Sequence, residues 1–456
     1  MRTAICIFLL SIVFASTEAQ ENLFFSAGDR VCFVGNSITN NGEFHHNILL
    51  YHTTRFPNQE LEFFNCGISG DNTQGIINRM ESDILIHKPN KVLIMIGMND
   101  INRGLYGTKP TINADTLRLR KEALSRYKTN LDKIITLLLS KKITVILQKP
   151  SIYDETAVLS TPTKIGANDA LKNCAEIMEE FSVKYKLQTV DYWTPMTKMN
   201  QEIQIKDPKA TLVGSDRIHP GAIGHIVMAY HFLKAEKAPA FVSHIVIDKN
   251  KKQQTSASKN CEINSIQWES NKITFKVKEA ALPFPVISEQ KEATELVPFT
   301  NELNTELLKV KGLSKGDYKL TIDSVLIGQF TAAQFSEGLN LANYPSTPQY
   351  KQAMRVRDIL WELRTVVSKY RGLKFIEFNG DFRKCPDKTN LQVVQNYMDS
   401  VFSTGSYKTN PYFKSRLKDY VQNKPKENEF VEMANNLRKK SYVEAQTKYH
   451  NYIIEP

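Results

Sequence analysis

The sequence predicts an α/β fold in which helices cover both faces of a parallel sheet, followed by a small β-rich domain and a helical C-terminal region. Short apolar runs alternate with helical periodicity between residues 30 and 238, which is typical of parallel strands joined by crossover helices. The run Val92–Gly97 is apolar throughout, as expected of a strand that is covered on both faces. Beyond residue 241 this alternation stops.

Five strands are expected in the sheet, each a short apolar run that ends at a glycine or a polar residue. They are Arg30–Gly35, Leu61–Gly67, Val92–Gly97, Ile143–Gln148 and Gln188–Tyr192. Between them, Leu124–Leu139 and Asn168–Lys184 carry apolar residues at every third or fourth position. This spacing predicts amphipathic helices that pack on the sheet.

The second half of the chain has a different pattern. The polar run Lys249–Asn260 is expected to be a linker or an exposed loop. Strand-like runs with glycine turns and then helical runs follow it, at Ile273–Val277, Leu307–Val310, Tyr318–Val325, Ala353–Tyr370, Asn390–Phe402 and Glu429–Tyr449. The predicted organisation is a signal peptide at 1–19, an α/β domain at 20–241, a β-rich domain at 242–335 and a helical region at 336–456.

Composition narrows the class of protein. With 456 residues, the chain is long enough for two or three domains. It has 41% hydrophobic and 23% charged residues, which excludes a disordered chain, and one early apolar run, which excludes a polytopic membrane protein. The net charge is +11, of which residues 351–456 contribute +8 through 20 Lys and Arg against 12 Asp and Glu. No nucleic-acid motif accompanies this excess, so a solvated basic surface is favoured over nucleic acid, anionic lipid or an acidic polysaccharide as a partner.

The first 19 residues have the pattern of a secretory signal. Arg2 precedes the apolar stretch Ala4–Ala15, and small residues at Thr17 and Ala19 predict cleavage after Ala19. The alternative, a membrane anchor, is disfavoured because the stretch is too short to span a bilayer, so no integral span is expected in the mature chain. The sequence has no Asn-x-Ser/Thr sequon, which favours a bacterial protein of the periplasm or the extracellular space.

The cysteines give no sign of a metal site or a redox dithiol, because none are paired as CxxC. Five remain after the signal: Cys32, Cys66, Cys174, Cys261 and Cys385. An odd number means that at least one is free or pairs between chains. Cys32 and Cys66 lie in strand-like runs and are expected to be buried free thiols.

Short groups of polar and small residues follow three of the expected strands, and a fourth such group lies near residue 216. The first strand leads into Ser37, the second is followed by Gly70, the third by Asn99, and Asp216 precedes His219 by three residues. Ligands of open α/β sheets bind at the carboxyl ends of strands. An Asp three residues before a His can reach its ring and fix the tautomer. A nucleophile, a base, an orienting acid and hydrogen-bond donors together meet the requirements of acyl transfer.

In order and spacing, these blocks resemble those of the SGNH hydrolases, also called the GDSL esterase/lipase family, over about residues 30–235. The resemblance implies a three-layer α/β/α, flavodoxin-like fold. It also implies Ser37 as nucleophile, His219 as base and Asp216 as orienting acid. The backbone N–H groups of Ser37 and Gly70 and the amide of Asn99 would form the oxyanion hole, and no metal or other cofactor is needed. One departure is Asn36, where the family usually has Asp, although Asn can also cap a helix.

Other polar residues near these blocks have simpler interpretations. Asp100 is expected to be a structural cap beside Asn99 and not the acid of the triad. No carboxylate or cysteine completes a ligand set for the clustered histidines, so they are expected to face solvent, and the two later ones to be structural. These are His45, His46 and His52, and then His225 and His231.

The loop after Asn99 carries the only hint of the substrate. Polar and aromatic residues in Ile101–Asn113 suit a sugar better than an acyl chain, and no Leu-rich lid is apparent. We therefore expect Asn36, Arg103 and Tyr106 to contact the substrate, an acetylated glycan or another small ester. The predicted function is an exported carbohydrate O-acetylesterase. The alternatives are a lipase or acylhydrolase on longer acyl esters, and a non-catalytic glycan-binding protein with a vestigial hydrolase domain.

Overall fold

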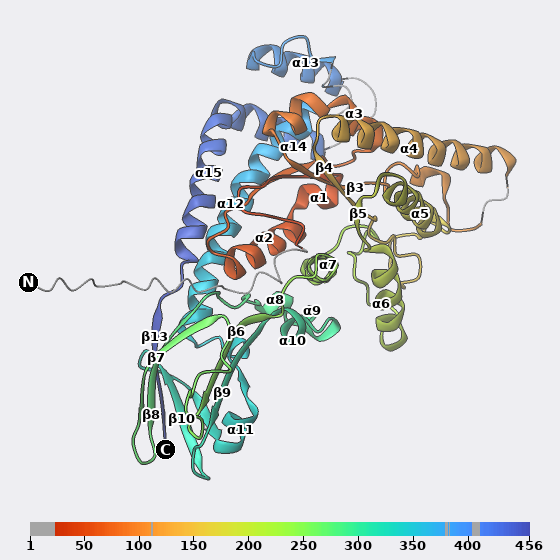
Figure 1. Cartoon of the computed structure of the whole chain (residues 1–456). Coiled ribbons are helices and arrows are strands. Elements are labelled where there is room, and N and C mark those ends of the chain that lie inside the picture. The colour runs from red at the N-terminus through yellow and green to blue at the C-terminus, as the bar shows by residue number, and fades with distance from the viewer. Residues whose placement is uncertain (1–22, 111–112, 379–381, 383, 404–410) are drawn as a thin grey trace, which may run out of the picture.

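The computed structural model describes residues 23–110, 113–378, 382, 384–403 and 411–456 (Figure 1). The expected signal peptide and its cleavage site lie outside these residues. In the described part of the chain, no helix is both long enough and apolar enough to cross a membrane.

A five-stranded parallel sheet forms the centre of the first half. Its strands are β1 (Arg30–Gly35), β2 (Glu62–Gly67), β3 (Lys91–Met95), β4 (Thr144–Gln148) and β5 (Gln188–Val190), in the order β2-β1-β3-β4-β5. These are the predicted strands, with ends that differ by one or two residues. The chain leaves β1 for β2 on one side and then returns to β3 on the other. Loops after these strands therefore meet at a switch point, where open sheets bind ligands.

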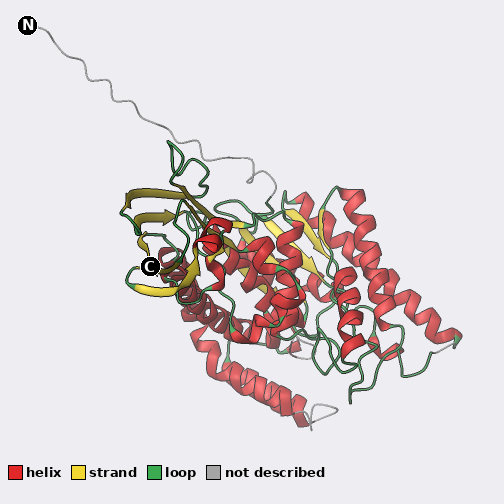
Figure 2. Cartoon of the chain, turned by 90° about the horizontal axis from the view of Figure 1, so that it is seen from below, coloured by secondary structure: helices red, strands yellow, loops and turns green. Residues whose placement is uncertain are grey.

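Helices cover both faces of this sheet, as predicted (Figure 2). Alternate strand residues point to opposite sides, so Phe33 belongs to one apolar cluster and Val34 to the other. The Phe33 side packs on α1 (Ser37–Asn41), α2 (Glu43–Arg55), α6 (Trp193–Lys206) and α7 (Ala222–Ala235). The Val34 side packs on α3 (Thr73–Asn78), α4 (Ala114–Ser140) and α5 (Ala167–Tyr185). The result is the three-layer α/β/α arrangement.

Two further sheets share one apolar core below the α/β part (Figure 1). The smaller sheet has the order β12-β9-β6, with β6 (Phe241–Asp248), β9 (Thr305–Lys311) and β12 (Leu339–Asn340). The larger has the order β11-β10-β13-β8-β7, with β7 (Cys261–Trp268), β8 (Ile273–Glu279), β10 (Asp317–Ile322), β11 (Val325–Thr331) and β13 (Tyr449–Glu455). Short helices lie between these strands: α8 (Ser288–Lys291), α9 (Ala293–Leu296), α10 (Phe299–Leu303) and α11 (Ala332–Glu337).

In its described residues, the C-terminal region is mainly helical up to residue 444, and the chain then returns to the β-rich part. It contains α12 (Pro348–Phe378), α13 (Leu391–Ser403), α14 (Pro411–Asn423) and α15 (Glu427–Glu444). Buried residues of α12 and α15 join the apolar cluster on the Phe33 side of the central sheet. The helix expected to reach Tyr449 ends five residues earlier, because the last residues alternate between exposed and buried and pair as β13.

Candidate active site

A sharp turn after β1 presents Ser37 as the first residue of α1. Gly35 ends the strand where a Cβ would lie 2.3 Å from Thr39 Oγ1 and 2.5 Å from the Met95 carbonyl, so only glycine fits this close approach. Asn36 then caps α1, since its Oδ1 accepts the Ile38 N–H at 3.1 Å. Asn at this position therefore caps the helix as the sequence suggested, and its side chain is buried.

Ser37, His219 and Asp216 form a hydrogen-bonded chain although they lie far apart in the sequence. Ser37 Oγ is 2.6 Å from His219 Nε2, and His219 Nδ1 is 2.5 Å from Asp216 Oδ2. A carboxylate only accepts hydrogen bonds, so the Asp216 contact places the ring proton on Nδ1 and leaves Nε2 to accept from the Ser37 hydroxyl. Although partial burial works to raise the pKa of Asp216, hydrogen bonds from the His219 ring and from two backbone N–H groups hold it below its usual range.

The turn that carries Asp216 and His219 is fixed by Arg217, which the sequence analysis did not single out. Arg217 has a left-handed backbone with φ +71°, and its buried side chain donates to three carbonyls of the loop at 154–161. Asp216 Oδ1 accepts the backbone N–H groups of Ile218 and His219, each at 3.0 Å. Both side chains of the Asp–His pair remain about half exposed, at 50% and 45%, so the site is open.

The loop after β2 passes close to the Ser37 turn. A Cβ on Gly67 would lie 2.2 Å from the backbone nitrogen of Asn40, so α1 can approach this strand end only over a glycine. Asn40 Nδ2 donates to the Gly67 carbonyl at 3.0 Å and ties the loop to α1. Gly70 at the tip is exposed and adopts φ +81°, a left-handed conformation that favours glycine.

Asn99 follows β3, and both the nitrogen and the oxygen of its side-chain amide are hydrogen-bonded. Its Nδ2 donates to the Asp71 carbonyl at 2.7 Å, and its Oδ1 accepts from Arg103 Nη1 at 2.9 Å. The same Arg103 nitrogen donates to the Met98 carbonyl at 2.5 Å. An amide group has two N–H donors, so one remains beyond the bond to Asp71. Arg103 thus orients Asn99, a contact that loop composition could not reveal.

Comparison with known proteins places this geometry in a family. A family model described as GDSL-like lipase/acylhydrolase matches residues 33–226. The solved structure of BT4096, a gut microbial diltiazem-metabolizing enzyme, is 31% identical with a TM-score of 0.87, and the match covers 96% of this chain and 99% of that one. The chain belongs to the GDSL-like lipase/acylhydrolase family. A curated relative, the acetylxylan esterase of Geobacillus stearothermophilus, is 24% identical over 185 residues, which are 39% of this chain and 74% of that protein.

Membership makes this GDSL-family protein a carboxylic ester hydrolase of the SGNH type. Its fold class agrees with the prediction, and the β-rich and C-terminal parts are also matched by BT4096, whose alignment spans nearly the whole chain. The family model covers only the α/β part, so it gives no information about what the additional parts do.

In this GDSL hydrolase the three expected substrate contacts lie in different surroundings. Asn36 is buried under the Ser37 turn, and Arg103 is half-buried beside Asn99. Tyr106 is only 6% exposed, and its ring lies 4.0 Å from the Arg120 guanidinium of α4. Lys109 of the same loop is exposed. The structure therefore brings Arg103 to the site but packs most of Tyr106 against α4.

Asp100 has the structural role expected of it. Its Oδ1 accepts the Thr73 backbone N–H at 2.9 Å and the Thr73 hydroxyl at 2.6 Å, which caps the start of α3. Its Oδ2 has no hydrogen-bond partner among the described residues. Burial raises the pKa of Asp100 to about 6.

The prediction that His45, His46 and His52 face solvent is wrong, because all three are buried in α2. His45 stacks on Phe33 at 4.8 Å, and His52 Nε2 lies 2.8 Å from Glu236 Oε1. The reason is that α7 and the C-terminal helix α12 pack against α2 and cover the side that was expected to face solvent. Within the described part of the chain, no three His, Cys, Asp or Glu side chains are grouped as metal ligands.

His225, Cys32 and Cys66 behave as expected, and His231 is half-buried. His225 is buried and stacks parallel to Phe44, which is a structural contact. The five cysteines beyond residue 22 are free, and Cys32 and Cys66 are fully buried in adjacent strands.

Proposed function

We propose that this protein is an exported carbohydrate O-acetylesterase that works through an acyl-serine intermediate. The observation that carries the catalytic part is the chain from Ser37 Oγ through His219 to Asp216, with distances of 2.6 and 2.5 Å. These distances lie within the range needed for a nucleophile, its base and the group that orients the base.

In the proposed mechanism, Ser37 Oγ attacks the ester carbonyl while His219 Nε2 takes its proton. Asp216 stabilises the imidazolium that forms. The backbone N–H groups of Ser37 and Gly70 and the free amide N–H of Asn99 donate to the oxyanion of the tetrahedral intermediate. His219 then protonates the leaving alcohol, and an activated water releases the acid and restores Ser37.

Two observations support a small acyl group on a sugar. Asp216, His219 and Gly70 are open to solvent, which suits an ester on an accessible sugar better than a long acyl chain that needs an enclosed groove. The curated relative is an acetylxylan esterase. The signal-like N-terminus supports export, which would bring the enzyme to glycans in the periplasm or the extracellular space.

The test is ester hydrolysis by the full mature chain, with Ser37→Ala and a control variant, Ser215→Ala, at an exposed serine beside Asp216. Ser37→Ala should lower kcat by at least about 10³-fold, whereas the control should retain activity. Residual activity in Ser37→Ala within about tenfold of wild type would reject the triad.

The acyl group is tested with a series of esters from acetate to octanoate. A groove for acyl chains gains about 0.8 kcal/mol for each CH₂ that it buries, so kcat/KM should rise along the series for a lipase. We expect the opposite, with kcat/KM highest on acetate and a steep fall beyond butyrate. Acetate release from acetylated xylan and from diltiazem, itself an acetate ester, then separates a glycan from a small non-sugar substrate. A rise through octanoate would favour the lipase alternative.

A further inference from the structure

We infer that the C-terminal helical region is part of the catalytic apparatus, because Arg371 of α12 positions the loop at residues 67–72, which carries Gly70. This inference rests on the proposed function, since Gly70 matters as a donor to the oxyanion. It assigns a role to a part of the chain that lies outside the segment matched by the family model.

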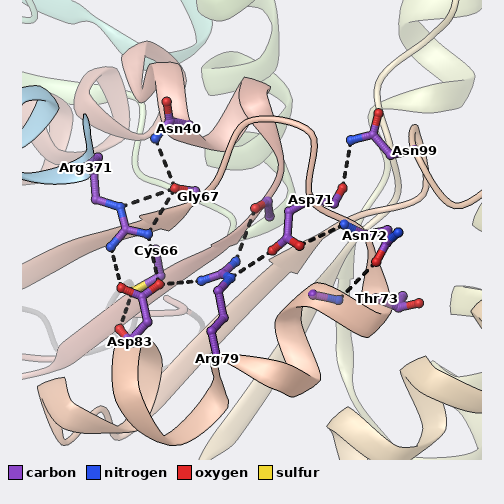
Figure 3. A network of polar contacts seen from close by, with 12 residues as sticks. Asn40, Cys66, Gly67, Asp71, Asn72, Thr73, Arg79, Asp83, Asn99 and Arg371 are labelled. Carbon is purple, nitrogen blue, oxygen red and sulfur yellow. Dashed lines mark hydrogen bonds and ion pairs between the residues drawn. The ribbon is translucent and has the colours of Figure 1, made fainter. Parts of the chain in front are cut away.

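The first contact is a fork of hydrogen bonds at the base of the loop (Figure 3). Arg371 Nε and Nη2 donate to the Gly67 carbonyl at 3.2 and 3.1 Å. Its Nη1 and Nη2 donate to the two carboxylate oxygens of Asp83 at 2.7 and 2.9 Å. Arg371 is 1% exposed, so water does not compete for these bonds. One guanidinium thus joins the carbonyl at the end of β2 to a carboxylate beyond α3.

The second contact continues from Asp83 to the far end of the loop. Asp83 Oδ2 accepts from Arg79 Nη1 at 2.6 Å, and Arg79 Nε donates to Asp71 Oδ2 at 2.8 Å. The Asp71 carbonyl in turn holds the Asn99 amide. Alternating charges therefore connect α12 to Asp71, which follows Gly70 in the chain and holds the Asn99 amide through its carbonyl (Figure 3). Arg79 Nη2 also reaches the Gly35 carbonyl, before the Ser37 turn, at 3.4 Å.

The electrostatics keep Arg371 and Asp83 charged although both are buried. Burial acts to lower the pKa of Arg371, but the Asp83 carboxylate raises it above its ordinary value overall. Burial acts to raise the pKa of Asp83, but the guanidinium groups of Arg371 and Arg79 hold it well below its usual range. Removing one member would leave a buried charge without its full set of partners, which is costly, so the neighbours would have to move.

An apolar contact also anchors the loop at residues 67–72 to the C-terminal helices. Ile68, the residue after Gly67, is 3% exposed and belongs to the apolar cluster of the C-terminal helices, with Leu373, Ile376 and Phe382 among its members. By contrast, no atom of the described residues lies within 4 Å of the position of a Cβ on Gly70. Among these residues the tip of the loop has no packing partner on that side, so its place depends on the anchors at residues 67, 68 and 71.

Oxyanion donors must be aimed at the oxygen of the transition state, and a displacement of about 1 Å can cost about 100-fold in rate. Arg371→Met should therefore lower kcat on an acetate ester by about 10- to 100-fold and change KM by less than about threefold. The affinity for phenylboronic acid, whose serine adduct mimics the tetrahedral oxyanion, should fall in parallel. Arg371→Lys keeps the charge but loses the fork, so its kcat should be intermediate.

The matched control is Arg438→Met. Arg438 is also a buried arginine of the C-terminal helices, but it contacts Glu62 and Asn435 and not the loop. Both Met variants should lower Tm, whereas only Arg371→Met should lower kcat and the boronate affinity. A role in stability alone would give the two variants equal kcat.

The inference is overturned if folded Arg371→Met and Arg371→Lys both keep kcat within about twofold of Arg438→Met. If Arg371→Met fails to fold, Arg371→Lys and Ile68→Val, which shortens the apolar anchor, decide by the same criterion. Ser37→Ala is measured in the same assay. Activity that survives Ser37→Ala would reject the proposed function, whereas wild-type kcat in the Arg371 variants with Ser37 still required would reject only this inference.

Discussion

Asn99 is the residue at which the polar loops of the site meet. Its carboxamide bridges the Asp71 carbonyl in the loop after β2 and the Arg103 side chain in the loop after β3. Because both bonds are made by the protein itself, they fix the direction of the remaining N–H. Preorganised donors of this kind stabilise a transition state more than a ground state.

This arrangement predicts the kinetic signature of Asn99→Ala. Loss of one oxyanion donor should lower kcat by about 10²- to 10³-fold and change KM much less. Steady-state kinetics on an acetate ester measures both constants. A change in KM alone would instead make Asn99 a residue that binds the ground state of the substrate.

Asp100, the next residue, has a structural role, and the pH dependence of protein stability can reveal it. Burial raises its pKa to about 6, above the value near 3.9 of an unfolded chain. The folded protein thus binds this proton more tightly, so the contribution of Asp100 to stability is complete below pH about 4 and is lost as the pH rises through about 6.

Asp100→Asn removes this titration but keeps an oxygen that can accept from Thr73. Its Tm relative to wild type should therefore increase as the pH rises from about 4 to 7, and its esterase activity should stay within about tenfold of wild type. Thermal melts across this pH range check the first expectation. Loss of activity as large as that of Ser37→Ala would mean that Asp100 belongs to the triad.

At the scale of elements, the strands and helices of the α/β part could be predicted because each is marked by a local pattern of residues. Strands β1 to β4 were predicted to within one or two residues, since each lies in a short, mostly apolar run. The polar blocks after them could be expected to meet, because the carboxyl ends of parallel strands share one edge. In the structure, Ser37 and His219 do contact each other across 182 residues of chain.

The features that could not be predicted depend on contacts between residues far apart in the sequence or on loop conformation, and these leave no local pattern. Arg371 and Asp83 are 288 residues apart, and neither residue type nor spacing marks them as partners. The burial of the histidines in α2 follows from contacts with α7 and α12, which come much later in the chain. The direction of Arg103 toward Asn99 is a property of loop conformation, which periodicity does not describe. Motifs therefore indicated the proposed reacting groups, whereas the contacts that hold these groups in place could be found only in the structure.

At the scale of the whole molecule, the C-terminal region is packed into the fold and is not an appendage. Several of its cations are in ion pairs within the fold, including Lys374 with Glu377 and Glu427, and Arg355 with Glu444. The region packs on the α/β part through α12 and α15 and ends inside the β-rich part as β13. The last residues thus complete the larger sheet of the β-rich part, so we expect them to be important for stability.

Removing strand β13 would test this expectation, because β13 is an inner strand of the larger sheet. It pairs with β10 on one side and with β8 on the other, so its removal divides the five-stranded sheet into two hairpins. Tyr452 and Ile454 are fully buried, and Tyr452 stacks on Phe275 at 5.0 Å. The Tyr452 hydroxyl also accepts from Gln349 at the start of α12, which connects the strand to the long helix.

Deletion of residues 449–456 should therefore cause aggregation or a large fall in Tm. Each buried apolar side chain contributes about 1.5–3 kcal/mol, so two of them are a large part of a folding free energy of about 5–15 kcal/mol. Deletion of only Glu455 and Pro456 keeps both side chains and serves as the control, with a Tm close to that of the full chain. A monomeric protein without residues 449–456 that melts within about 2 °C of this control would show that the β-rich part does not depend on the returning strand.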